Sequence, residues 1–181
     1  MRIAVSIGHH PQRQGASYAD WSEYALCAPV AGFAVREITR AGHQAFMAPA
    51  ASLVSKVAWI NGLEVDLAVE IHVNAGLGHG CETLYCPSSA RGLDAALAAN
   101  GHLVSDLSLR DRGVKEGWHR LDPDRGPNFF LKHTKMPALI IEPGFIETER
   151  TMFIEARRLG CSIGVAAMKA AEAIGCKEAS A

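Results

Sequence analysis

The chain has 181 residues, of which 49% are hydrophobic and 20% charged, and its formal net charge is -1 with a pI near 6.7. A charge so close to zero gives no basic field for nucleic acid or anionic lipid, and no uncharged apolar stretch approaches the ~18–20 residues of a membrane helix. This length supports one domain with a sizeable core. We therefore predict one domain over residues 1–176 and a short tail at 177–181, without nucleic-acid binding or membrane insertion.

The start of the chain predicts synthesis in the cytoplasm. A strand is predicted directly at Arg2–Ile7, which leaves no room ahead of it for the parts of a secretory signal. The five cysteines match neither a CxxC redox pair nor a four-cysteine zinc site. We interpret them as reduced thiols, although Cys81 and Cys86 flank a predicted strand where metal binding or a disulfide is the alternative.

Predicted strands and helices alternate in the first half of the chain. Short apolar runs rich in β-branched residues are typical of buried strands, and apolar residues at helical spacing predict amphipathic helices. Asp20 is a candidate helix cap and Gly42 a helix stop. In order, this half is predicted to contain a strand at 2–7, a polar loop at 11–19, a helix between Asp20 and Gly42, a strand near 43–48, a helix near 51–61 and a strand at 66–71.

The second half continues the alternation with longer connections. Polar and apolar residues alternate at 82–85, which predicts an exposed or edge strand. Residues 110–127 are polar and contain Gly and Pro, which favours a long loop with one short extended piece around Val114. The other predicted elements are an amphipathic helix at 89–107, a strand at 138–141 and two helices within 147–173 that break near Gly160.

This order of elements predicts a single-domain α/β fold, with a central, mostly parallel (mixed) sheet flanked by helices on both faces. Three of the strands end next to a residue that can bind a metal or move a proton: His9, His72 and Glu142. In an open α/β sheet, ligands bind beyond the carboxyl ends of the strands. These three side chains are therefore predicted to share one pocket.

The residue types in this pocket are those of a zinc hydrolase. A catalytic zinc commonly has three protein ligands and one open position, and His9 and His72 supply two. Glu23, in the first turn of the following helix, is the candidate third ligand, at a place where a carboxylate also suits the helix dipole. Glu142 is the candidate general base and acid of amide hydrolysis. Each residue taken singly is at least as often structural or solvated, so the prediction depends on their joint placement.

These segments resemble the zinc-dependent N-acetylmuramoyl-L-alanine amidases of the type-3 family, which cut the amide between N-acetylmuramic acid and L-alanine in peptidoglycan. The resemblance implies a Zn²⁺ cofactor held by His9, Glu23 and His72, with Glu142 as the catalytic glutamate and peptidoglycan as the substrate. In order, the matching segments are Gly8-His9 before Gly15-Ala16, Glu23, Ile71–Ala75 (IHVNA), Gly80–Tyr85 (GCETLY), Arg112–Lys115 (RGVK) and Pro137–Ile146 (PALIIEPGFI).

The chain departs from the family pattern at three positions. His10 stands where Gly is usual, Glu70 replaces a usual Ser, and Thr148 stands where Asn is common. The first two put a second ligand-capable group beside each metal histidine. If the strand geometry continues, the side chain of His10 should point to the opposite face from that of His9.

Other polar residues near the predicted site are candidate substrate contacts. Arg112 and Lys115 suit the carboxylates of a stem peptide, although solvated loop cations are at least as common, and Asn74 lies in the second histidine segment. His79 and His119 lie in predicted loops, where contact with substrate or metal competes with the commoner surface role.

Two other functions stay open on the sequence alone. A zinc carboxypeptidase-like or N-acyl amino acid amidohydrolase would use the same chemistry on a smaller substrate. A non-catalytic wall-binding or metal-storage protein would keep the pocket without turnover, but the presence of Glu142 argues against it. Because no export signal is predicted, we expect a phage or prophage lysin, or an autolysin released by lysis, that acts on the cell wall after synthesis in the cytoplasm.

Overall fold

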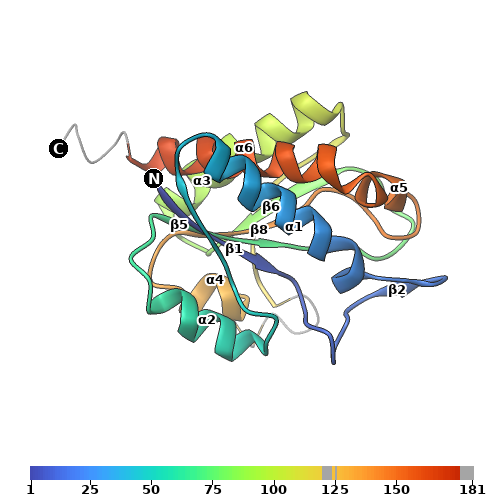
Figure 1. Cartoon of the computed structure of the whole chain (residues 1–181), viewed down its shortest axis with the longest axis horizontal. Helices are drawn as coiled ribbons and strands as arrows, with labels where there is room; N and C mark the ends of the chain where they lie inside the picture. The colour runs from blue at the N-terminus through green and yellow to red at the C-terminus, as the bar shows by residue number, and fades with distance from the viewer. Residues whose placement is uncertain (120–123, 125, 176–181) are drawn as a thin grey trace.

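A computed structural model describes residues 1–119, 124 and 126–175 (Figure 1). Its centre is a six-stranded sheet in the order β4-β1-β5-β8-β6-β7. Strands β4, β1, β5 and β8 run parallel, whereas β6 runs antiparallel to β8 and parallel to β7. The strands are β1 (Arg2–Ile7), β4 (Gln44–Met47), β5 (Leu67–Ile71), β6 (Cys81–Tyr85), β7 (Asp111–Glu116) and β8 (Ala138–Glu142).

Helices cover both faces of this sheet, which confirms the predicted α/β fold (Figure 1). One face carries α1 (Glu23–Arg40), α3 (Ala90–Leu107) and α6 (Ala156–Gly175), and the other carries α2 (Leu53–Asn61) and α4 (Phe129–His133). The remaining elements are the short hairpin β2 (Ser17–Tyr18) and β3 (Trp21–Ser22), and α5 (Arg150–Ile154). The predicted domain end at 176 and the predicted tail at 177–181 lie outside the described residues.

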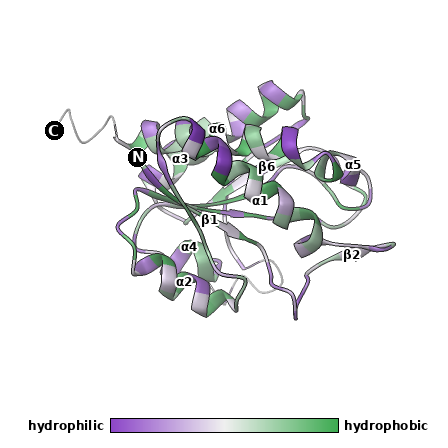
Figure 2. Ribbon diagram, viewed as in Figure 1, coloured by the Kyte–Doolittle hydropathy of each residue, from purple (hydrophilic) through white to green (hydrophobic). Residues whose placement is uncertain are grey.

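Side chains that alternate along the strands build the two layers of the core. In β1, Ile3 and Val5 pack towards α1, α3 and α6, while Ala4 packs towards α2 and α4. The helices are correspondingly amphipathic, with hydrophobic and hydrophilic residues alternating along them (Figure 2). None of the helices in the described ranges is long and apolar enough to cross a membrane.

The prediction that 82–85 forms an exposed or edge strand is wrong. Strand β6 lies between β8 and β7, and its residues Cys81, Glu82 and Thr83 are buried. The polar side chains of β6 can be buried because they have hydrogen-bond partners. The Thr83 hydroxyl, for example, donates to Asn100 Oδ1 of α3 at 3.2 Å. The edge strand next to β6 is instead β7, a six-residue strand within the segment predicted as a long loop.

Two predicted helix boundaries also need correction. The cap of α1 is Ser22 rather than Asp20, since the Ser22 side chain accepts from the backbone N–H of Ala25. The last two helices break at Glu155, and Gly160 lies inside α6. There, a Cβ would lie 2.5 Å from Cβ of Phe33 on α1, so Gly160 permits the close approach of two helices instead of ending one.

Substitution of Gly160 by alanine is expected to destabilise the protein. The added methyl group gains helix propensity but meets the backbone and Phe33 of α1, and such overpacking costs roughly 1–3 kcal/mol. Gly101→Ala is the matched control, because a Cβ at that exposed position of α3 meets nothing within 4 Å. Its expected effect is a stabilisation of about 0.5–1 kcal/mol. Urea denaturation measures both changes, and equal effects of the two substitutions would contradict this account of Gly160.

Candidate metal centre

The carboxyl ends of the three strands singled out in the sequence lie side by side in the sheet. Strand β1 pairs with β5 through Ile7 and Ile71, and β5 pairs with β8 through Ile71 and Ile141. The residues that follow are consequently neighbours. His9, Glu23, His72 and Glu142 all line one cavity of about 590 Å³.

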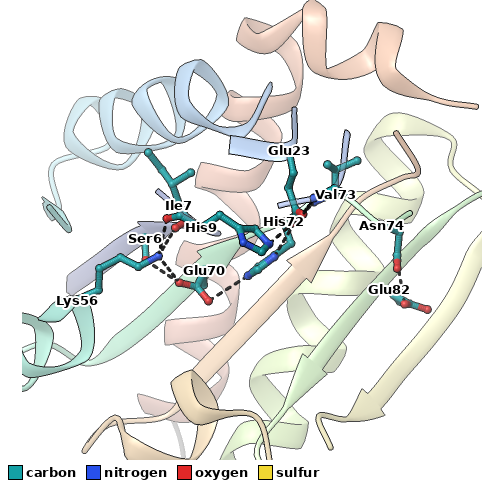
Figure 3. Close-up of polar contacts among 11 residues, drawn as sticks. Ser6, Ile7, His9, Glu23, Lys56, Glu70, His72, Val73, Asn74 and Glu82 are labelled. Carbon is teal, nitrogen blue, oxygen red and sulfur yellow. Dashed lines mark hydrogen bonds and ion pairs between the residues drawn. The ribbon is translucent and has the colours of Figure 1, made fainter. Parts of the chain in front are cut away.

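The Glu23 carboxylate contacts both histidines (Figure 3). Its Oε2 atom is 3.0 Å from Nε2 of His9, and its Oε1 atom is 2.8 Å from Nδ1 of His72. The carboxylate also accepts from the backbone N–H groups of Ala16 at 3.1 Å and Val73 at 3.2 Å, which fix its orientation. One ligand-capable atom of each of the three residues lies within 4.8 Å of the others. Tetrahedral zinc places its ligand atoms roughly 3.3 Å apart, so the separations are of the right size.

Two glycines leave room for these side chains. A Cβ on Gly8 would lie 2.6 Å from Nδ1 of His72, and one on Gly15 would lie 2.7 Å from Nε2 of His9. Gly15 also has a φ of +78°, which side chains with a Cβ disfavour. A larger residue at either position would displace one of the histidine rings.

The strand geometry assumed for His10 is wrong, because β1 ends at Ile7 and His9 adopts a left-handed φ of 64°. His10 contacts Gln12, with Nδ1 2.9 Å from Oε1. His79 is also outside the group of three, and its Nδ1 lies 3.8 Å from Glu149 Oε1.

The charges around Glu23 and His72 favour a cation between them. Burial alone would raise the pKa of Glu23, but hydrogen bonds and charge from His72 and His9 hold it well below its usual range. Burial likewise acts to lower the pKa of His72, yet Glu23 and Glu70 raise it to about 10. A positive charge is thus stabilised here, whether it belongs to an imidazolium or to a metal ion.

Glu70 lies at the other nitrogen of the same ring. Its Oε2 atom is 3.0 Å from Nε2 of His72, and its Oε1 atom accepts from Nζ of Lys56 at 2.9 Å and from the Ser6 hydroxyl at 3.0 Å. Burial would raise the pKa of Glu70, but His72 and Lys56 lower it. Of this pair, only Glu70 stands out in the sequence, and Lys56 was not among the predicted site residues. The available signal was a glutamate inside a wholly apolar strand, which needs a buried cationic partner.

A second carboxylate cluster lines the same cavity. Glu82 faces Glu142 across β6 and β8 and is 6% exposed. Its Oε2 atom accepts from Nε of Arg112 at 2.8 Å and from Nζ of Lys115, and its Oε1 atom accepts from Nδ2 of Asn74 at 2.9 Å.

The structure thus gathers the three predicted substrate contacts around one carboxylate. Arg112 and Lys115 line the cavity, whereas Asn74 is 1% exposed. His119 lines the cavity as well.

Comparisons with known proteins agree with this architecture. The model of the N-acetylmuramoyl-L-alanine amidase family matches residues 3–157. An amidase of that name from Clostridium difficile 630 has a similar structure, with a TM-score of 0.79 at 24% identity over 92% of this chain and 95% of that one. The catalytic domain of CwlV from Bacillus (Paenibacillus) polymyxa gives a TM-score of 0.77 at 22% identity over 92% and 96% of the two chains.

Two further relatives have other descriptions. The catalytic domain of the CD27L endolysin, which targets Clostridia difficile, gives a TM-score of 0.74 at 22% identity over 93% of this chain and 97% of that one. All three structural likenesses are below 25% identity and show the shared fold. A 100-residue segment is 35% identical to the uncharacterized protein YqiI of Bacillus subtilis (strain 168), covering 52% of this chain and 44% of that protein. The chain thus matches less than half the length of that relative.

The Glu82 cluster leads to a pH-dependent stability. Burial would raise the pKa of Glu82, but Lys115, Asn74 and Arg112 lower it from 4.5 to about 2. The ionised carboxylate therefore contributes its full stability above pH ~4.5 and loses it as the pH falls towards 2. We expect Glu82→Gln to lower the free energy of unfolding by about 1–3 kcal/mol at pH 7, and by progressively less in acid.

Urea denaturation of both proteins at pH 7 and at pH 3 measures this difference. Glu172→Gln, at an exposed position of α6, is the control and should change stability little at either pH. A loss of stability in Glu82→Gln that is the same at both pH values would contradict the assigned pKa shift.

Proposed function

The chain belongs to the N-acetylmuramoyl-L-alanine amidase family, and we propose that it hydrolyses the amide between N-acetylmuramic acid and L-alanine in peptidoglycan. The observation that carries this proposal is the convergence of His9, Glu23, His72 and Glu142 on one cavity. The likeness to an endolysin catalytic domain supports a wall-degrading role.

The residues fit a zinc ion. Two imidazole nitrogens and a carboxylate oxygen within 4.8 Å of one another are the donor set of many catalytic zinc sites, and Gly8 and Gly15 leave space beside them. We assign His9, Glu23 and His72 as the ligands. When bound, zinc supplies a Lewis acid that activates water and stabilises the charge developing on the amide oxygen.

We assign proton transfer to Glu142. This residue ends β8 beside the second histidine, since the backbone N–H of His72 donates to the carbonyl of Ile141 at 2.9 Å. Hydrolysis forms a bond between the water oxygen and the carbonyl carbon and breaks the bond from that carbon to nitrogen. The Glu142 carboxylate takes the proton of the water and gives it to the departing amine of L-alanine.

Substrate binding is assigned to the cluster around Glu82. Arg112 and Lys115 share this one carboxylate, so the cluster presents an excess of positive charge to the cavity. A stem peptide carries carboxylates that would pair with such charge. The buried amide of Asn74 donates to the Glu82 carboxylate and helps to hold it in place.

Product analysis is the direct test of the proposed activity. Purified peptidoglycan incubated with the zinc-loaded protein should yield intact glycan strands and peptides with new L-alanine amino termini. Amino-terminal labelling and mass spectrometry identify both products. Release of single amino acids from the peptide carboxyl termini would instead identify a carboxypeptidase.

Glu142→Gln is expected to bind zinc like the unaltered protein but to hydrolyse peptidoglycan at least about 100-fold more slowly, because the amide side chain cannot accept the proton. Zinc content by atomic absorption and the rate of release of amino termini measure the two properties. Glu172→Gln, on the exposed face of α6, should leave both unchanged. Undiminished hydrolysis by the Glu142 variant would remove this residue from the mechanism.

Removal of the metal should abolish activity and reduce stability. A ligand that binds only the folded state stabilises it by mass action, so zinc at about 100 times its Kd should add about 2.7 kcal/mol to the metal-free protein. Thermal unfolding with and without zinc measures this gain. It should disappear in His9→Ala and His72→Ala but persist in His10→Ala and His79→Ala. An equal gain in all four variants would refute the assigned ligands.

A further inference from the structure

One buried lysine contacts both histidine segments of the metal centre. We infer that Lys56 and Glu70 are positioning residues for metal binding: Lys56 holds the backbone at His9, and Glu70 holds the ring of His72 (Figure 3). The inference rests on the proposed metal site and assigns a role to two residues that the proposed chemistry leaves unused.

The ammonium group of Lys56 is fully occupied. Lys56 enters from α2 and is 2% exposed. Its Nζ atom donates to the carbonyl of Ile7, to the carbonyl of His9 at 3.2 Å and to Oε1 of Glu70 at 2.9 Å. An ammonium has three N–H donors, and these are three acceptors. The contacts therefore define one position for the ammonium and for the chain segment around it.

That segment needs such support. His9 has a left-handed φ of 64°, a conformation that costs a side chain with a Cβ some strain and persists only where its surroundings enforce it. Lys56 binds the carbonyl of His9 itself and that of Ile7, the last residue of β1. The ammonium thus holds the turn that directs the His9 ring to Glu23.

Glu70 determines which nitrogen of His72 faces the other ligands. The two ring nitrogens point in different directions, so a hydrogen bond at one fixes the position of the other. Oε2 of Glu70 is 3.0 Å from Nε2 of His72, and Nδ1 of the same ring is 2.8 Å from Glu23. With Nε2–H donating to Glu70, Nδ1 is left as the atom that binds a metal.

The position of this pair argues against a purely structural role. All five residues of β5 are buried, and a buried ion pair is often no more stabilising than apolar side chains of similar size. Ser6, Glu70 and Ile140 form a cross-strand row, and the row could be apolar throughout. Apolar residues could fill the same space. They could not, however, bind the carbonyl of His9 or the ring of His72, which Lys56 and Glu70 contact.

The test compares two double variants that both lack buried charge. Lys56→Met with Glu70→Gln keeps an acceptor for Nε2 of His72, and Lys56→Met with Glu70→Leu removes it. Double replacement avoids the unpaired buried charge that either single change to an apolar residue would leave. Circular dichroism and thermal unfolding of the metal-free proteins establish that both fold.

Zinc affinity is measured by competition with a chromophoric chelator, and ligand geometry by the visible spectrum of the cobalt-substituted protein. The Leu variant should bind zinc about 10- to 100-fold more weakly than the Gln variant and should show an altered cobalt spectrum. The Gln variant should in turn bind more weakly than the unaltered protein, since the carbonyl of His9 has lost its ammonium partner. Equal zinc affinities and spectra in the two double variants would overturn the role of Glu70, and a Gln variant equal to the unaltered protein would overturn that of Lys56.

Glu70→Asp covers the case in which the Leu variant does not fold. Aspartate keeps a charge for Lys56 but is one methylene too short to reach Nε2 of His72, so the same weakening is expected. Unchanged zinc affinity in this variant would also overturn the inference. Failure of the unaltered protein to bind zinc is a separate outcome, because it would refute the metal site on which the inference rests.

Discussion

Parallel pairing of β1 with β5 and of β5 with β8 is the constraint on which the centre depends. This pairing places the carboxyl ends of the three strands side by side. His9, His72 and Glu142 therefore line a single cavity, although His72 lies 63 positions after His9 and 70 positions before Glu142. Strand β6 runs the other way and brings Glu82 alongside Glu142. The antiparallel strand thus adds the Glu82 cluster to the cavity at the carboxyl ends of β1, β5 and β8.

Charge balance is the second requirement, since each buried carboxylate at this end of the sheet has cationic partners. Glu23 has two histidines, Glu70 has Lys56 and His72, and Glu82 has Arg112 and Lys115. A lone buried carboxylate would be protonated or would destabilise the fold. Because these partners come from α2, from β7 and from the segments that follow β1 and β5, the elements must pack correctly before the charges are compensated. Folding and the formation of the site are therefore one process.

Residues with a local signal can be recognised in this sequence, whereas residues whose role depends on distant contacts cannot. His9, His72 and Glu142 follow recognisable apolar strands, and Glu23 lies in the first turn of a periodic helix. Lys56 looks like any helix lysine until α2 is packed against β5. The order of β6 and β7 and the left-handed turn at His9 likewise depend on pairings between segments far apart in the chain, which residue patterns do not encode directly.

Glu23 is the member of the His9, Glu23 and His72 group that comes from a helix, and contacts elsewhere in the fold bring it to the two histidines. Its position follows from α1, which Gly160 allows to approach α6 closely, and its orientation follows from backbone donors at Ala16 and Val73. Those donors belong to the loops that carry the two histidines. The carboxylate is consequently oriented by the same segments whose side chains it joins, so a displacement of either loop would move donor and ligand together. Such mutual fixation favours a preformed geometry over one that a metal ion must assemble.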